Sequence, residues 1–265
     1  HGLPDYVIGY HLPLHLPAEG RRTVVLRLET PFAHNSLIFI KPYREAVREA
    51  HFHTVAVWVA AGAMAALIVY NLFLGVGLRL PVYLFYVGHA SGHLLYLLTA
   101  MGMAGPALPV LERYLFLNIP GIIIGVLFGS LFIYRFLEVP TLSLALARAY
   151  RLFMAAICLL PLVGFIAGPH LLLTAARSSH LVLVALVITA AVIGVIKKKR
   201  EATYILVGWG VMVALTARGM LGVLGIMELT VGAGGLALWA VLFEMFFLSL
   251  ALADRVRRLS HEKEA

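Results

Sequence analysis

The stretch VAVWVAAGAMAALIVYNLFLG, residues 55–75, contains no charged side chain. An apolar helix of about 20 residues is long enough to cross the hydrocarbon core of a bilayer. This stretch therefore predicts a transmembrane helix, and six further apolar blocks follow it. We predict an all-α membrane protein, a seven-transmembrane helix bundle preceded by a short β segment. The predicted blocks are roughly 55–75, 82–103, 114–134, 152–168, 180–196, 203–226 and 231–253.

The composition supports lipid as the solvent for much of the chain. Hydrophobic residues make up 62% of the 265 residues and charged residues only 13%, whereas a soluble domain carries about a quarter charged residues. The mean hydropathy is +0.94. The single cysteine, Cys158, lies in an apolar run and excludes an intrachain disulfide.

The first 50 residues have a different pattern, with Pro and Gly between short runs that alternate apolar and polar side chains. Two such runs are RRTVVLRLE (21–29) and NSLIFIKPY (35–43), and this alternation is typical of strands. So few strands do not form a stable sheet alone. We interpret residues 1–52 as the end of a β domain or as an arm that packs on something else. Because His1 is not preceded by Met or by a signal pattern, we expect a removed signal peptide or, with more weight, a segment of a longer protein.

The basic residues follow the predicted topology. One set of loops, together with the tail, carries twelve Lys and Arg residues, and the alternate loops carry only Arg113 and Arg177. The positive-inside rule then predicts a multi-pass membrane protein with the N-terminus outside and the C-terminus in the cytoplasm. Because the charges are divided among the loops, we expect no nucleic-acid partner for this chain of net charge +8. The twelve are Arg79, Arg135, Arg148, Arg151, Lys197, Lys198, Lys199, Arg200, Arg255, Arg257, Arg258 and Lys263.

Polar residues inside apolar blocks are candidates for function, because they are costly at membrane depth. Arg218 lies in the sixth block, Glu244 in the seventh, and Asn71 in the first. An Arg218–Glu244 ion pair requires the two blocks to be staggered; otherwise Arg218 extends to the outer interface. Glu244 is either a switch residue or a hydrogen-bonded carboxyl group that holds helices together.

His89 and His93 are four residues apart and share one face of a predicted helix. This spacing suits a metal ion or a haem, and an outer-leaflet metal site with other histidines is one interpretation. The other, which we favour, is polar packing next to Ser91 and the small Gly88 and Gly92. The other histidines are His51, His53, His170 and His180.

The last block continues into the basic tail without a Pro or Gly break. Apolar residues follow a heptad pattern with one polar position, which is typical of a helix that pairs with another helix. We predict a coupling helix over residues 255–265, continuous with the transmembrane domain at 53–254, and a homodimer formed through this seam. The alternative is an ordinary positively charged membrane anchor. The seam residues are Leu242, Met245, Ser249, Leu252, Val256 and Leu259.

The chain resembles the bacterial seven-transmembrane receptors with diverse intracellular signalling modules (7TMR-DISM). The resemblance lies in YNLFLGVGLRLPVYLFYVGH (70–89), VVLRLETPFAHNSLIFIKPYREAVREAHF (24–52) and EMFFLSLALADRVRRLSHEKEA (244–265). It implies a receptor whose periplasmic jelly-roll domain binds a carbohydrate or another small molecule, followed by seven helices and a cyclase, kinase or phosphatase output module. Only the end of the jelly roll and no output module fall within this chain.

We therefore predict a membrane-embedded signal transducer that is not an enzyme and has no cofactor or resident metal. No nucleophile with a base, phosphate-binding glycine loop or paired carboxylate site is recognisable in the sequence. The expected partners are lipid, a second copy of the chain, the downstream signalling domain and the outer ligand. The alternatives are a metal- or haem-binding enzyme that uses His89 and His93, and, less favoured, a transporter.

Overall fold

The computed structural model describes residues 23, 25, 42–100, 118–223 and 233–264. These residues form eight helices and contain no strand. The helical class is therefore confirmed for this part of the chain, and the described part of each predicted apolar block lies on a different long helix. Residues 101–103, 114–117, 224–226 and 231–232 of these blocks lie outside the described residues. The number of membrane crossings stays a prediction. The helices are α1 Tyr43–Leu78, α2 Pro81–Ala100, α5 Asn118–Phe136, α6 Val139–Leu142, α7 Leu144–Ala167, α8 Pro169–Ile196, α9 Arg200–Val223 and α10 Ala233–Glu264.

The first helix begins earlier than the sequence predicts. Residues 43–52, predicted as part of the β segment, are helical, because α1 starts at Tyr43 after Pro42. The segment YREAVREA is rich in Arg, Glu and Ala, which favour a helix. The predicted boundary at residue 52 is therefore wrong. The predicted strand at 21–29 and nearly all of that at 35–43 lie outside the described residues.

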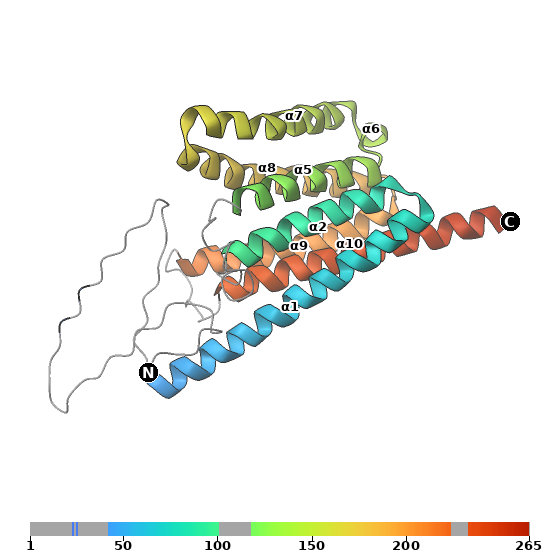
Figure 1. Cartoon of the computed structure of the whole chain (residues 1–265). Helices are drawn as coiled ribbons and strands as arrows, with labels where there is room; N and C mark the ends of the chain where they lie inside the picture. The colour runs from blue at the N-terminus through green and yellow to red at the C-terminus, as the bar shows by residue number, and fades with distance from the viewer. Residues whose placement is uncertain (1–22, 24, 26–41, 101–117, 224–232, 265) are drawn as a thin grey trace.

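The turn between α1 and α2 consists of Arg79 and Leu80 and is followed by Pro81. Arg79 adopts a left-handed conformation (φ 54°), and its N–H donates to the carbonyl of Gly75. This arrangement satisfies carbonyl groups at the end of α1, and Pro81 then occupies the first position of α2, where its missing N–H has no cost. The turn makes α1 and α2 antiparallel neighbours (Figure 1).

Six long helices form a closed ring in the order α1, α2, α5, α8, α9 and α10, in which each packs on the next and α10 packs on α1. The helix α7 lies outside this ring against α8 and α5 (Figure 1). Helix α10 also contacts α2 across the ring. The long helix α10 ends at the opposite end of the bundle from the start of α1 (Figure 1).

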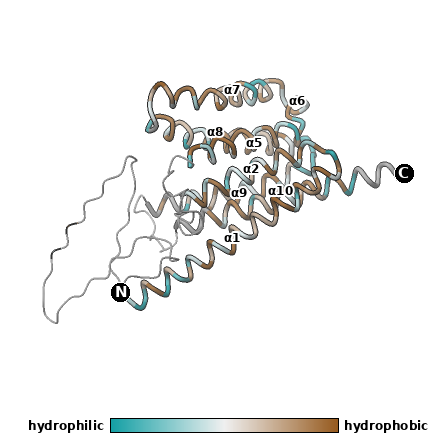
Figure 2. Tube along the Cα trace, in the orientation of Figure 1, coloured by the Kyte–Doolittle hydropathy of each residue, from teal (hydrophilic) through white to brown (hydrophobic). Residues whose placement is uncertain are grey.

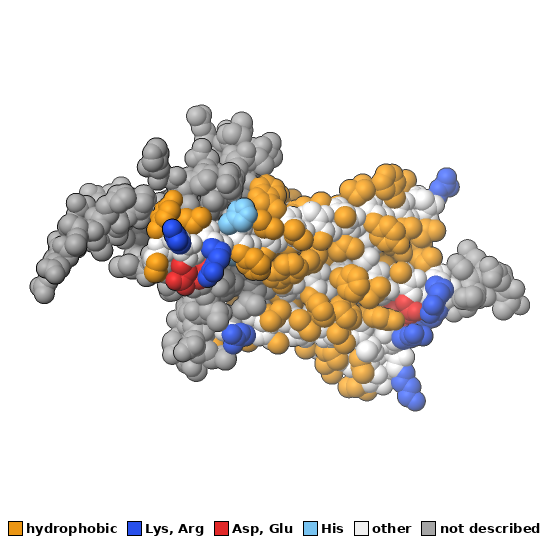
Figure 3. All heavy atoms as spheres, turned by 90° about the horizontal axis from the view of Figure 1, so that it is seen from below, with side chains coloured by type: hydrophobic (Ala, Val, Ile, Leu, Met, Phe, Trp, Pro, Cys, Tyr) orange, Lys and Arg blue, Asp and Glu red, His pale blue; other side chains and the backbone are white. Residues whose placement is uncertain are grey.

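The described surface has the character of a membrane protein. Four helices, α1, α5, α7 and the part of α8 from His170 onward, are long and apolar enough to cross a membrane, judged by length and composition. Hydrophobic residues run along the helices (Figure 2), and hydrophobic side chains cover the middle of the face in Figure 3, with Lys and Arg toward both ends. This distribution matches an apolar layer between two polar interfaces.

Candidate functional site

Helices α2 and α5 approach closely because glycines face each other at their contact. Gly121, Gly125 and Gly129 are spaced by four residues on α5, and Gly88 and Gly92 have the same spacing on α2. A Cβ atom added to Gly92 would lie 2.7 Å from the Cα of Gly125. Small residues at this spacing allow the backbones of membrane helices to approach. The sequence interpretation included Gly88 and Gly92 but missed the matching row of glycines on α5.

The same glycines make room for two imidazole rings. A Cβ atom on Gly129 would lie 2.5 Å from Nδ1 of His89, and one on Gly125 would lie 2.8 Å from Nδ1 of His93. Both histidines are buried, with His89 fully so. The spacing of four residues, which suggested a shared face, therefore places both rings against α5.

His89 connects three helices. Its Nδ1 lies 2.7 Å from the carbonyl oxygen of Gly125 on α5, and its Nε2 lies 3.0 Å from Oε1 of Glu244 on α10. The carbonyl group can only accept, so Nδ1 carries a proton and donates it. Glu244 is fully buried, and His89 is therefore the partner of the intramembrane acid.

The His89–Glu244 contact holds one shared proton. With Nδ1–H committed to Gly125, the second hydrogen bond needs a proton either on Nε2, giving an imidazolium and a carboxylate, or on Glu244, giving two neutral groups. Both forms have zero net charge, and a pair without this proton would place an uncompensated negative charge in an apolar interior. The pair can therefore move this proton between the two side chains without changing its net charge.

Further aromatic and imidazole rings surround this pair. The ring centroid of His93 lies 4.4 Å from that of His89 and 5.4 Å from that of His180 on α8. Trp209 on α9 stacks at 6.3 Å from His89 and 6.4 Å from His180. Sequence reasoning missed Trp209 and placed His180 near an outer helix end, because the contacts join four separate helices.

Two buried polar atoms near this cluster have no hydrogen-bond partner among the described residues: Oε2 of Glu244 and the indole Nε1 of Trp209. Buried polar groups in native proteins are normally bonded, so exceptions point to strain, function or a bound water molecule. The free oxygen leaves Glu244 one further acceptor site. Among the described residues, the carboxyl group of Glu244 is therefore held by a single hydrogen bond, that to His89 on α2.

Other polar contacts join α10 to α1 and α2. The hydroxyl of Tyr86 donates to the carbonyl of Met245 at 3.0 Å, and that of Tyr83 donates to the carbonyl of Leu252 at 3.3 Å. Nδ2 of Asn71 donates to the hydroxyl of Ser249 at 3.1 Å. With His89, these groups hold one face of α10 over its length inside the bundle.

This face includes most of the predicted heptad seam. Met245, Ser249 and Leu252 are buried within the chain, while Leu242 and Val256 are partly buried. The middle of the seam therefore packs against α1 and α2 and is not open to a second copy. The side chain of Leu259 lies outside those described, and the homodimer stays a prediction.

Arg218 is exposed on α9, away from the partner proposed for it. The Arg218–Glu244 ion pair is not found among the described side chains, because Glu244 faces His89 on α2. That possibility was wrong. Exposure agrees with the other interpretation, in which the Arg218 side chain extends along apolar surface toward polar solvent.

The metal or haem alternative receives no support from this geometry. Both nitrogens of His89 are engaged, and Nδ1 of His93 lies 3.1 Å from the carbonyl oxygen of His89. No group of three or more His, Cys, Asp or Glu side chains in the described part of the chain is arranged to hold a metal ion. The contacts of both histidines with α5 agree with the polar packing that we favoured, which stays a prediction.

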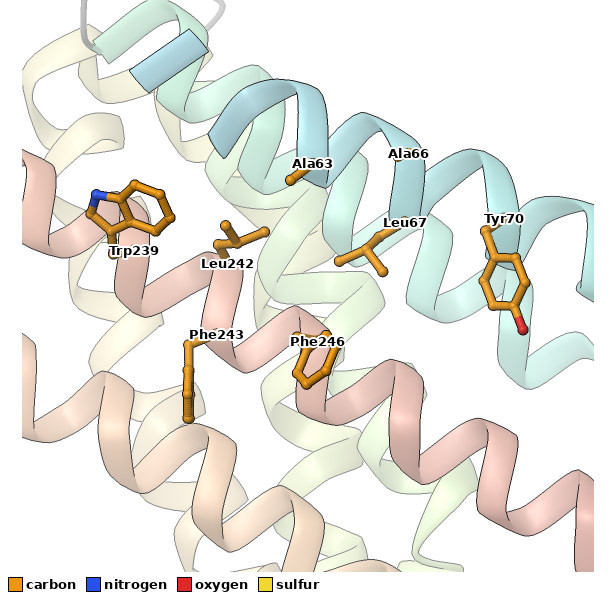
Figure 4. Close-up of a pocket in the computed structure, with 8 residues that line it drawn as sticks. All are labelled: Ala63, Ala66, Leu67, Tyr70, Trp239, Leu242, Phe243 and Phe246. Atoms are coloured by element: carbon orange, nitrogen blue, oxygen red, sulfur yellow. The ribbon is translucent and has the colours of Figure 1, made fainter. Parts of the chain in front are cut away.

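An apolar groove of about 600 Å³ lies between α1 and α10, apart from the polar cluster (Figure 4). Its walls are almost entirely apolar and contain no charged side chain. Leu242, the first seam residue, forms part of one wall. The other lining residues are Ala63, Ala66, Leu67, Tyr70, Trp239, Phe243 and Phe246.

We expect Tyr86→Phe to lower the free energy of unfolding by about 0.6 kcal/mol, the average for a hydrogen bond between membrane helices. The substitution removes the donor to Met245 and keeps the buried ring. Thermal unfolding in detergent measures the effect. Tyr70→Phe on the exposed side of α1 is the control. Equal melting temperatures for the two variants would show that the bond to α10 contributes nothing.

Comparison with known proteins adds one match. The model of a protein family described as 7TM diverse intracellular signalling matches residues 54–255. This range includes the whole polar cluster and most of α10. Comparisons with curated proteins and with solved structures found no match.

Proposed function

Because the chain belongs to the 7TM diverse intracellular signalling family, we propose that it is a transmembrane sensor module that relays an outer signal through α10 to a cytoplasmic output domain. The observation that carries this proposal is the attachment of α10. One continuous helix, Ala233–Glu264, carries the buried Glu244 and continues beyond the rest of the bundle (Figure 1). A movement of this helix would reach whatever follows it.

The proposed orientation places the end of α10 in the cytoplasm and the start of α1 outside. The excess of Lys and Arg in alternate loops supports it. We propose that a small molecule or carbohydrate acts from the outer side, as the family resemblance implies. The proposed receptor is a protein of the bacterial inner membrane, and a homodimer would suit an output enzyme that works in pairs.

The proposed mechanism is a shift or rotation of α10 between two packings. Helix α10 is held inside the membrane by hydrogen bonds from α1 and α2, including the bond to His89. A ligand changes this equilibrium only if it binds the two packings with different affinity. Hydrogen bonds of modest strength suit this purpose, because each can break and form again one turn along the helix.

The experiment that tests the proposal fuses a reporter enzyme, active as a parallel dimer, after Ala265. One to four alanines are inserted after Ser260, beyond Arg258, which makes the last described contact of α10 with the bundle. Each residue rotates the following segment by about 100° and advances it by about 1.5 Å. We expect reporter output to follow the helical phase, with the insertion of four residues closest to the parent.

A flexible Gly-Ser insertion of the same length is the control for distance alone. Output that decreases steadily with length in both series, without helical phase, would contradict a rigid relay through α10. Output that is unaffected by every insertion would contradict any coupling through this segment.

A further inference from the structure

Three separate segments meet where α10 leaves the bundle. They are the turn between α5 and α6, the turn between α8 and α9, and the α10 residues from Asp254 to Arg258. The contacts among them are made by charged side chains, several of which donate to the carbonyl groups at helix ends. The sequence analysis explained these cations by topology alone, and the structure gives several of them specific partners.

Glu138, in the turn after α5, has a backbone conformation that favours glycine. Its φ is 52°, in the left-handed region, where the backbone of a residue with a Cβ atom is strained. The neighbouring Leu137 and Val139 are fully buried and hold the turn in place. A strained residue that is not glycine suggests that its side chain has a role.

The carboxylate of Glu138 contacts two cations from different segments. Oε2 lies 3.3 Å from Nζ of Lys199 in the α8–α9 turn, and Oε1 lies 3.4 Å from a guanidinium nitrogen of Arg255 on α10. Glu138 therefore connects α10 to both inner turns. Among the described carboxylates, that of Glu138 alone contacts a cation of the α8–α9 turn and a cation of α10.

Backbone carbonyl groups reinforce this connection. Lys199 donates to the carbonyl of Leu137 at 2.8 Å, and Arg255 donates to that of Phe136 at 2.9 Å and lies over the Phe136 ring at 5.4 Å. These carbonyls belong to the C-terminal end of α5, where the helix dipole is negative and attracts cations. Three interactions therefore hold Arg255 against α5: the helix dipole, the hydrogen bond to the Phe136 carbonyl and the contact with the Phe136 ring.

A second set of contacts joins α10 to the start of α9. Asp254, which is nearly buried, lies 3.6 Å from Arg200, and Arg258 contacts Glu201. Asp254 and Arg258 thus bind the start of α9, whereas Arg255 binds the end of α5. A rotation of α10 would break both sets at once.

We propose that Glu138 is the positioning residue of a clamp that holds α10 in one rotational position at the inner end of the bundle. The clamp consists of Glu138, Lys199 and Arg255. Its opening is the step that frees α10 to rotate, so this inference rests on the proposed function. Glu138 is 55% exposed and its two partners 27% each, and such pairs are weak and screened by salt. The clamp is thus suited to opening and closing.

The test measures the position of α10 directly, by spin-label distances in the whole chain in lipid nanodiscs. Labels are placed at the exposed positions Leu144→Cys and Ala253→Cys, with the native exposed cysteine removed by Cys158→Ala. We expect one narrow distance distribution in the parent. Glu138→Gly is expected to add a second distance because the carboxylate is lost. Glycine relieves the backbone strain at this position, so we expect a melting temperature at or above that of the parent.

Two further variants define the result. Arg255→Gln keeps a donor to the carbonyl of Phe136 but removes the charge that Glu138 contacts, and it is expected to add the same second distance. Arg148→Gln, which removes an exposed inner cation outside the clamp, is expected to leave the single distance unchanged. A parental distribution in Glu138→Gly or in Arg255→Gln, or a second distance in Arg148→Gln, would overturn the clamp. This readout requires no output domain, so the clamp can fail while the insertion experiment succeeds, and the reverse.

Discussion

Gly92→Ala is expected to separate α2 from α5 and to reduce the free energy of unfolding by about 3 kcal/mol, the upper end for overpacked cores. The added Cβ atom would lie 2.7 Å from the Cα of Gly125, 2.8 Å from the carbonyl oxygen of Gly121, and closer still to the amide nitrogen of Gly125. All three are backbone atoms, so no side-chain rotation relieves the contact. The measurement is thermal unfolding and the yield of folded protein in detergent.

Gly210→Ala is the matched control, because a Cβ atom there would meet nothing within 4 Å. In the middle of α9, alanine is expected to stabilise the chain by about 0.5 kcal/mol or more, since glycine weakens a helix interior. The two substitutions add the same methyl group and have opposite expected signs. Equal melting temperatures for them would contradict the close packing of α2 on α5.

The second large effect is expected at the buried His89–Glu244 pair. Glu244→Leu leaves the Nε2 of His89 without a partner, and His89→Leu leaves the carboxyl group without one. Each single substitution is expected to cost about 1–3 kcal/mol for the unsatisfied buried group. The double substitution removes both polar groups and is expected to cost less than the sum, with a coupling of about 1–2 kcal/mol.

Thermal unfolding of the four proteins in this cycle measures the coupling. A second cycle, of Tyr86→Phe with Glu244→Leu, is the comparison. Both residues join α2 to α10 but through separate hydrogen bonds, so we expect a smaller coupling. Strictly additive effects of His89→Leu and Glu244→Leu would mean that the 3.0 Å contact contributes no specific interaction energy.

The sequence predicts the helices well because hydrophobic length is a local property. The described part of each predicted block lies on a helix. Helix α1 begins earlier than predicted because the charged segment YREAVREA has no apolar stripe, although its residues favour a helix. The family resemblance was confirmed by the match over residues 54–255, and its jelly-roll part stays a prediction.

The site was predicted only in part, because its contacts depend on how separate helices are arranged. His89 and Glu244 are 155 positions apart in the sequence, and no local pattern indicates which buried base meets which buried acid. The heptad seam illustrates the same limit. A row of apolar residues at spacings of three and four is equally typical of a face inside the bundle and of one between two subunits, and Met245 and Leu252 lie inside.

The left-handed turn at Glu138 was also beyond sequence reasoning. Glutamate is a good helix former and is rare in this conformation. Its position follows from Leu137 and Val139, which are buried on either side and force the turn. The two inner cations that the structure binds to this turn, Lys199 and Arg255, are recognisable in the sequence only as positive charge.

The central claim is that α10 relays a signal and that the bond between Glu244 and His89 sets its resting position. The most direct test is the basal output of the reporter fusion carrying Glu244→Gln, compared with the amount of folded protein. Glutamine can donate its amide hydrogen to Nε2 of His89 but cannot exchange a proton with it. We predict an unchanged amount of folded protein with a shifted basal output. An unchanged output from folded protein, or failure to accumulate, would contradict a switching role and leave Glu244 as a residue that only holds helices together.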